Sequence, residues 1–154
     1  MKPWLWRLRA RVSYWVARQL FGWPWFVKQP QGWHWLEGQF ARMAALGDVQ
    51  AQSFYGHILA FRGVGIGARE EGVRLLRLAA EAGDAKAAYQ LGVMCLAGTA
   101  SIAPDAVASV HWWTLALNAG HPMAALKLAQ LYRQGGPGLA PDPQAAQRYE
   151  QGRH

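Results

Sequence analysis

The sequence predicts an all-α fold, a solenoid of antiparallel helix pairs preceded by an amphipathic N-terminal helix. Three observations lead to this prediction. Residues 84–120 have the pattern of two helices joined by a loop of small residues. A similar spacing of apolar and small residues occurs before and after that stretch. The Gly-Asp and Gly-His pairs that end each helix pair recur at intervals of 36 and 37 residues, which indicates an internal repeat.

The central stretch shows this pattern most clearly. One side of its first helix carries apolar or small residues at offsets 0, 4, 5 and 8, namely Ala87, Leu91, Gly92 and Cys95. Gly98 and Pro104 then break the helix, and Asp105 is a suitable N-cap for the next one. The second helix carries an apolar stripe of Trp112, Trp113, Ala116 and Leu117. Two apolar stripes on short neighbouring helices predict a helical hairpin.

The same first-helix spacing recurs on both sides of the central copy. Its members are Ala51, Tyr55, Gly56 and Leu59 before it, and Ala124, Leu128, Ala129 and Tyr132 after it. The turns between copies are Gly47-Asp48, Gly83-Asp84 and Gly120-His121. We therefore divide the chain into an arm at 1–32 and a repeat domain at 33–154, the latter with a half repeat at 33–47 and repeats at 48–83, 84–120 and 121–154.

The pattern resembles the Sel-one-like repeat, the α/α relative of the tetratricopeptide repeat. The second-helix motif of that family is matched at Asp105, Trp112, Trp113 and Ala116 in the central copy, and at Asp142, Ala145, Ala146 and Tyr149 in the last. The first copy departs from the motif, because Leu75 and Leu76 replace its Trp-Tyr pair and its loop lacks an Asp. The resemblance covers residues 33–154. It implies a right-handed solenoid that contacts other proteins and is not catalytic.

Basic residues and tryptophans are concentrated near the N-terminus. Residues 1–36 contain six Lys or Arg and no acid, so they contribute +6 to the net charge of +7, and they hold seven of the nine Trp. Residues 1–22 are predicted to form a helix, with Pro3 in its first turn and Gly22 at its end. One side of this helix carries the apolar residues Leu5, Leu8, Val12, Trp15 and Val16, flanked by Arg7, Arg11 and Arg18.

This arm allows two interpretations. In one, it lies on an anionic membrane surface, with tryptophans at headgroup depth and arginines on the lipid. In the other, it caps the open end or the groove of the solenoid. The residues assigned to the arm contact are Trp4, Arg7, Arg11, Trp15, Arg18, Trp23 and Trp25. The arginines and tryptophans of the arm could also bind nucleic acid through phosphate contacts and base stacking, but nothing else in the chain supports that partner.

Neither export nor membrane spanning is expected. Arg18 interrupts the apolar segment that could serve as a signal peptide, and no small-residue cleavage site follows it. A spanning helix needs about 20 apolar residues, and the uncharged run at 106–126 is broken midway by Gly120 and Pro122. We therefore expect a cytoplasmic protein without a signal peptide or transmembrane helix. It would be peripheral on the inner face of the membrane if the arm binds lipid.

The segment that follows the first helix is predicted to be an extended connector. Pro24 and Pro30 lie within residues 23–32, and proline disfavours a helical conformation in the residue before it. We expect Trp23 and Trp25 to pack on the repeat body.

Residues 33–47 are predicted to be the second helix of a leading half repeat. In this alignment Phe40 takes the place of Leu76 and Trp113 in the later copies. Residues 4–21 could supply the missing first helix in space, an arrangement that favours the cap interpretation.

A partner-binding face is predicted on the first helices, opposite their core positions. In solenoids of this type the first helices line the concave face. The residues at offsets 2, 3 and 6 are Ser53, Phe54, His57, Tyr89, Gln90, Val93, Leu126, Lys127 and Gln130. Several are apolar, and exposed apolar stripes mark contact surfaces. The alternative is that the estimated helix rotation is wrong and these residues belong to the core.

No constellation for chemistry is found in the sequence. The five His do not pair at metal-ligand spacing with another His, Cys or acid on one helix, and the single cysteine, Cys95, occupies a core offset. We expect no catalytic residue, metal or cofactor, and another protein as the partner. One alternative is a subunit stable only within a larger complex, its Trp-rich arm buried in a neighbour. Another alternative is a hydrolase of the cell-wall or β-lactam type, an activity described for some relatives. This chain lacks the cysteines and the clustered polar residues expected of such an enzyme.

Overall fold

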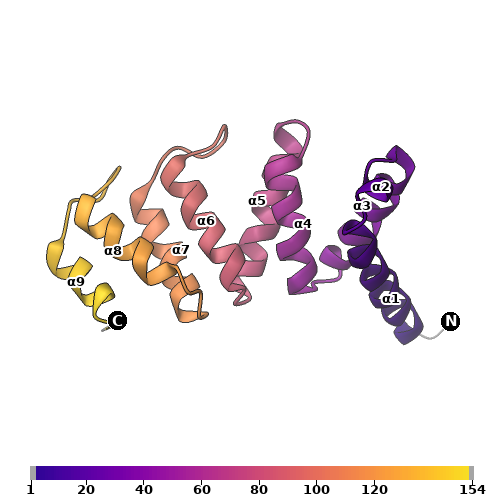
Figure 1. Ribbon diagram of the computed structural model, residues 1–154, viewed down its shortest axis with the longest axis horizontal. Helices are drawn as coiled ribbons and strands as arrows, with labels where there is room; N and C mark the ends of the chain where they lie inside the picture. Colours follow the sequence, from indigo (N-terminus) through magenta and orange to yellow (C-terminus); the bar gives the residue numbers. More distant parts are fainter. Residues whose placement is uncertain (1–2, 153–154) are drawn as a thin grey trace.

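The computed structural model describes residues 3–152, with side chains described from Arg7 onward. The described residues form nine helices and no β-strand. The helices are α1 (Pro3–Phe21), α2 (Pro24–Val27), α3 (Pro30–Ala45), α4 (Val49–Arg62), α5 (Ile66–Glu81), α6 (Ala85–Ala97), α7 (Ala106–Asn118), α8 (Ala124–Gln134) and α9 (Pro143–Glu150). The pairs α4–α5, α6–α7 and α8–α9 follow one another in a row from the N-terminal to the C-terminal end (Figure 1). The prediction of an all-α repeat solenoid is confirmed.

Aspartate caps and glycine turns set the register of this row. The side chain of Asp84 accepts a hydrogen bond from the backbone N–H of Ala87 at 2.7 Å, and thereby satisfies a donor that the helix start leaves free. Asp48, Asp105 and Asp142 cap α4, α7 and α9 in the same way. The predicted turn glycines Gly47, Gly83 and Gly120 have φ values of 81°, 95° and 84°. Glycine adopts this left-handed conformation at little cost, so these turns end the helix pairs where expected.

The core lies between the helix pairs and contains the aligned residues predicted for it. Phe40, Leu76 and Trp113, which occupy equivalent positions in three copies, are all buried. Glycines let the helices approach closely. A Cβ atom on Gly72 would lie 2.3 Å from the backbone nitrogen of Ala60, so no side chain fits where α5 crosses α4.

The prediction of an extended connector is wrong, because residues 23–32 are largely helical. Pro24 begins the short helix α2, and Pro30 begins α3. At the first position of a helix the missing N–H of proline costs nothing, since that donor has no partner within the helix. Pro24 and Pro30 therefore start helices here instead of breaking them. The helix predicted to begin near residue 33 therefore starts at Pro30.

The arm helix α1 packs along α3 and occupies the place of a first helix in the leading pair. Its buried residues Ala10, Tyr14 and Ala17 recur at helical spacing. The ring of Tyr14 meets that of Phe40 edge to face, with centroids 5.9 Å apart. The ring of Phe21 also packs against that of Phe40, with centroids 6.1 Å apart. These contacts correspond to the cap interpretation of the arm.

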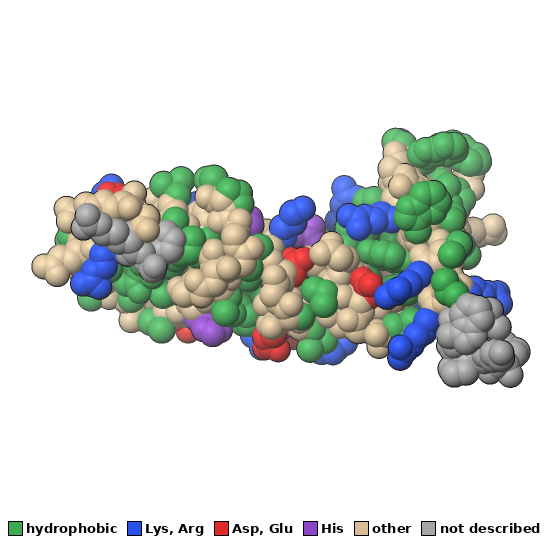
Figure 2. All heavy atoms as spheres, turned by 90° about the horizontal axis from the view of Figure 1, so that it is seen from below, with side chains coloured by type: hydrophobic (Ala, Val, Ile, Leu, Met, Phe, Trp, Pro, Cys, Tyr) green, Lys and Arg blue, Asp and Glu red, His purple; other side chains and the backbone are tan. Residues whose placement is uncertain are grey.

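The predicted apolar stripe of α1 lies on the side opposite this packing face. Leu8, Val12 and Trp15 are 48%, 59% and 63% exposed. The helix therefore has two apolar faces, one of small and aromatic residues turned to α3 and one of larger residues turned outward. Figure 2 shows hydrophobic side chains at the surface of this end of the molecule, with Lys and Arg side chains around them.

Candidate functional site

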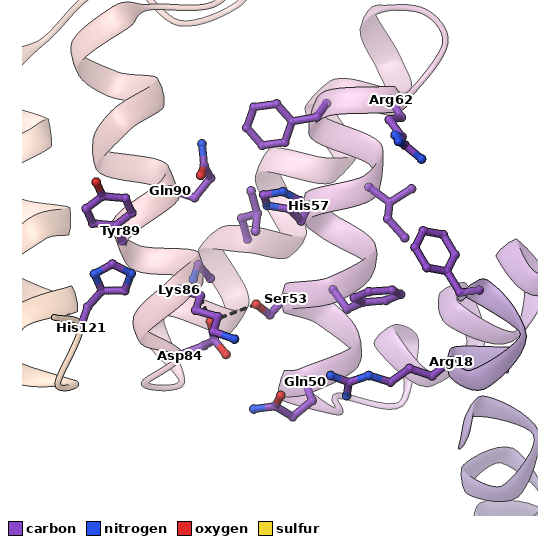
Figure 3. A pocket seen from close by; sticks show the side chains of 16 residues that line it. Arg18, Gln50, Ser53, His57, Arg62, Asp84, Lys86, Tyr89, Gln90 and His121 are labelled. Carbon is purple, nitrogen blue, oxygen red and sulfur yellow. Dashed lines mark hydrogen bonds between the residues drawn. The ribbon is translucent and has the colours of Figure 1, made fainter. Parts of the chain in front are cut away.

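A cavity of about 560 Å³ lies between α4 and α6. This volume is in the range of about 300–1,000 Å³ that is usual for ligand sites. Its lining comes from α4 and α6, from the C-terminal end of α1, from α5 and from the turn before α8. Figure 3 shows the labelled side chains around this hollow.

Asp84 ties the two sides of the cavity together at its base. Its carboxylate accepts a hydrogen bond from the hydroxyl of Ser53 at 2.9 Å, in addition to the N–H of Ala87 that it caps. The two donors belong to different helices, Ser53 to α4 and Ala87 to α6, so the cap of α6 also fixes α4. Figure 3 marks the bond from Ser53. Both bonds end on Asp84 Oδ1.

Aromatic rings form the wall nearest to α1. Phe54 is half-buried, with Phe40 at 5.1 Å and Phe21 at 5.2 Å from its ring centroid, both edge to face. The guanidinium carbon of Arg18 lies 5.6 Å from the same centroid, a cation–π distance. Phe54 thus belongs to the core on one side and to the cavity on the other. Arg18, expected in the arm contact, lines the cavity instead of the outer surface.

Tyr89 and His121 form the opposite wall. Their rings are stacked, with centroids 4.1 Å apart and planes 10° apart, and the backbone N–H of Met123 donates to His121 Nδ1 at 3.3 Å. Burial, and after it the positive charge of Lys86, lowers the pKa of His121. Burial likewise lowers the pKa of His57. Both shifts favour the uncharged form of the ring.

The charged groups of the lining are mainly basic. Arg18, Arg62 and Lys86 line the cavity, and Asp84 is the acid among the lining residues. The ion pairs found in residues 7–152 join other residues: His34–Glu37, Arg74–Glu71 and Arg133–Glu150. The cavity therefore combines an apolar floor with three basic side chains and one acid, and none of the three is in an ion pair.

Five of the nine predicted face residues come together in this cavity: Ser53, Phe54, His57, Tyr89 and Gln90. Val93 lines a smaller hollow of about 300 Å³ beside the α4–α5 loop. Leu126, Lys127 and Gln130 lie on α8, away from both. Sequence reasoning missed Arg62, Lys86 and His121 in the lining. Helix periodicity does not single them out, because Arg62 and Lys86 lie outside the repeating offsets of the first helices and His121 lies in a turn. The one signal in the sequence was His121, which stands where the other turns have Asp.

The remaining arm residues are exposed. Arg7, Arg11 and Trp15 lie on the surface of α1, while Trp23 and Trp25 are 65% and 69% exposed. The expectation that these last two pack on the repeat body is therefore wrong; Phe26 and Val27 make that contact instead. The side chain of Trp4 lies outside the described residues.

Chemically reactive arrangements are sparse. No group of three potential metal ligands occurs among the residues that the structure describes. Cys95 is buried, and this burial raises the pKa of its thiol, which disfavours the reactive thiolate. None of the helices in the described range is long and apolar enough to cross a membrane.

An all-helical row of antiparallel pairs with a lined hollow between first helices defines an α/α repeat protein of the solenoid class. The chain belongs to the Sel1 repeat family, which it matches at residues 49–84, 85–121 and 122–149. The predicted family is thereby confirmed. Proteins built from this repeat commonly bind other proteins.

Two solved structures have the same architecture. A Sel1 repeat protein from Oxalobacter formigenes is 26% identical, with a TM-score of 0.68 over 75% of this chain and 33% of that one. The protective antigen c5321 of uropathogenic Escherichia coli, which displays an SLR fold, has a TM-score of 0.74 over 94% of this chain and 30% of its own. Its identity is 22%, so this likeness concerns the fold alone. The chain spans about a third of the length of these proteins. No curated protein matches the sequence.

Proposed function

We propose that this chain is a non-catalytic binding module that holds a segment of another protein in the cavity between α4 and α6. The observation that carries the proposal is the cavity itself. It lies between neighbouring repeats, it has an apolar floor that includes Phe54, and the amide of Gln90 and the hydroxyl of Ser53 stand at its surface. A few polar groups over an apolar floor are typical of sites that fix a ligand's orientation.

Site-specific photocrosslinking in the native host tests this proposal. A photoreactive phenylalanine analogue replaces Gln90, which lines the cavity, or Gln147, which is exposed on α9 as a matched control. We expect a discrete protein adduct from position 90 and at least tenfold less of it from position 147. The same adduct from both positions, or from neither, would contradict the proposal.

A second candidate function concerns the outward face of α1, defined by Leu8, Val12 and Trp15. We propose that this face lies on an anionic membrane surface and tethers the module peripherally. Arg7 and Arg11 flank the face on one side and Arg9 on the other, and all three are exposed. Apolar side chains between cations suit the boundary between acyl chains and anionic headgroups, and each cation near such a surface contributes about 1 kcal/mol.

The exposed tryptophans beyond α1 suit the same kind of partner. Trp23 and Trp25 lie next to the C-terminal end of α1 and are largely exposed. Tryptophan favours the headgroup region, where its ring is partly apolar and its N–H can still meet water. The arm would thus combine the two earlier interpretations, with one face of α1 capping the solenoid and the other meeting lipid.

Vesicle flotation measures this tether. We expect the chain to bind phosphatidylglycerol vesicles. Its binding to phosphatidylcholine vesicles should be at least tenfold weaker, because the cations need anionic headgroups. Replacing Leu8, Val12 and Trp15 together with serine should abolish the binding. Replacing Val64 and Ile66 with serine is the matched control, since Val64 on the α4–α5 loop and Ile66 at the start of α5 are both exposed and apolar. This variant should float as the unaltered chain does. Failure of the unaltered chain to float would reject lipid and favour a neighbouring protein that covers this face.

A further inference from the structure

We infer that the cavity between α4 and α6 selects an acidic segment of its partner, with an apolar side chain of that segment seated between its carboxylates. This inference rests on the proposed function and names the chemistry of the ligand. It follows from three features of the lining: its net positive charge, the placement of that charge around the opening, and the apolar floor beneath it.

The three cations of the lining outnumber its one acid. Arg18, Arg62 and Lys86 line the cavity together with Asp84. The Asp84 carboxylate already accepts hydrogen bonds from Ser53 Oγ at 2.9 Å and from the N–H of Ala87 at 2.7 Å. None of the three cations takes part in an ion pair with the described residues. Because burial favours the uncharged forms of His57 and His121, these rings do not alter this balance.

The three cations come from different helices and surround the opening. Arg18 reaches in from the last turn of α1, Lys86 stands in the first turn of α6, and Arg62 ends α4 (Figure 3). The guanidinium of Arg18 is held over the ring of Phe54, so part of the ordering needed for binding is present before the ligand arrives. Charges placed apart around one opening suit several carboxylates along an extended segment better than a single compact anion.

An apolar floor lies between these charges. Phe54, Ile58, Phe61 and Leu76 line it from α4 and α5, and Phe61 is about half exposed. An apolar side chain of the partner would remove this surface from water, while its neighbouring carboxylates face the cations. The amides of Gln50 and Gln90 also line the cavity and each supplies donors and an acceptor for the main chain of such a segment. A basic segment would meet like charges, which disfavours it.

Selection from a random peptide library displayed on phage tests the inference with the full chain immobilised. We expect the selected peptides to carry more Asp and Glu than the starting library, with an apolar residue among them. A synthetic peptide of the consensus sequence is then measured by fluorescence anisotropy. Changing Arg18, Arg62 or Lys86 to glutamine should weaken its binding about fivefold each, the effect of one exposed charge pair. Arg77→Gln and Arg148→Gln are matched controls outside the lining and should change it less than twofold.

The outcomes separate this inference from the proposed function. Replacing Gln90 with tryptophan fills the cavity and should block every peptide bound there. If blocked peptides are neutral or basic, or if their affinity is unchanged by the three glutamine substitutions, the acidic preference is wrong and the binding module stands. If Gln90→Trp blocks no selected peptide, the cavity is not a binding site and both proposals fail. Circular dichroism of each variant confirms that the helices are retained.

Discussion

Replacing Trp113 with alanine is expected to lower the free energy of unfolding by about 3–5 kcal/mol, the usual cost of removing a large buried aromatic side chain. Trp113 is 2% exposed and packs α7 against α6, where Gly92 leaves room for its ring. Its indole N–H donates to the carbonyl oxygen of Tyr89 at 3.1 Å. The substitution therefore opens a cavity and removes a partly buried hydrogen bond. Urea unfolding followed by far-ultraviolet circular dichroism measures the change.

Trp25→Ala provides the control for this experiment. Its side chain is 69% exposed, and substitutions at such positions usually change stability by less than about 0.5 kcal/mol. The same comparison separates two roles of tryptophan in this chain, since Trp25 is assigned to the outer surface and Trp113 to the core. Equal losses from the two variants would mean that the packing around Trp113 is not what holds α6 and α7 together.

Gly72→Ala is the second substitution with a large expected effect. A Cβ at this position would lie 2.3 Å from the backbone nitrogen of Ala60 and 2.8 Å from the carbonyl oxygen of Gly56. These are backbone atoms, so relief requires α4 and α5 to move apart. Overpacking of this kind costs about 1–3 kcal/mol, and the gain of about 1 kcal/mol in helix propensity offsets only part of it. We expect a net loss, measured as a lower urea midpoint.

The same substitution at Gly38 should have the opposite sign. Gly38 lies in the interior of α3, and a Cβ there would meet no atom within 4 Å. Alanine gains roughly 0.5–1 kcal/mol over glycine in a helix interior, so Gly38→Ala should raise the urea midpoint. If both variants are stabilised, the close approach of α4 to α5 at Gly72 does not exist in solution.

The repeats could be predicted because their determinants are local. A capping side chain within three residues stabilises a helix start, and a left-handed turn favours glycine, so Asp84 and Gly83 direct their own local structure. The core side of each first helix follows from 3.6-residue periodicity, and Ala87, Leu91 and Cys95 are buried as this periodicity predicts. The family could be recognised from the same pattern.

The arm was harder to predict because its residues suit two environments. Pro24 and Pro30 can end one helix or begin the next, and only the surrounding chain selects between these roles. Helix α1 has apolar residues on two opposite sides. Hydrophobicity alone favours the larger residues Leu8 and Trp15, but close packing on α3 requires small residues such as Ala17 beside the aromatic rings.

The cavity was decided only by the tertiary structure. Arg18, Lys86 and His121 are separated by roughly 70 and 35 residues, and no local rule relates them. They meet because α1 packs on α3, because the Asp84 cap also binds Ser53 of the preceding repeat, and because Tyr89 stacks on the turn before α8. Sequence by itself determined the helices, their caps and the repeat, through interactions that span a few residues. The cavity and its charge depend on how neighbouring repeats pack, which involves contacts between residues far apart in the chain.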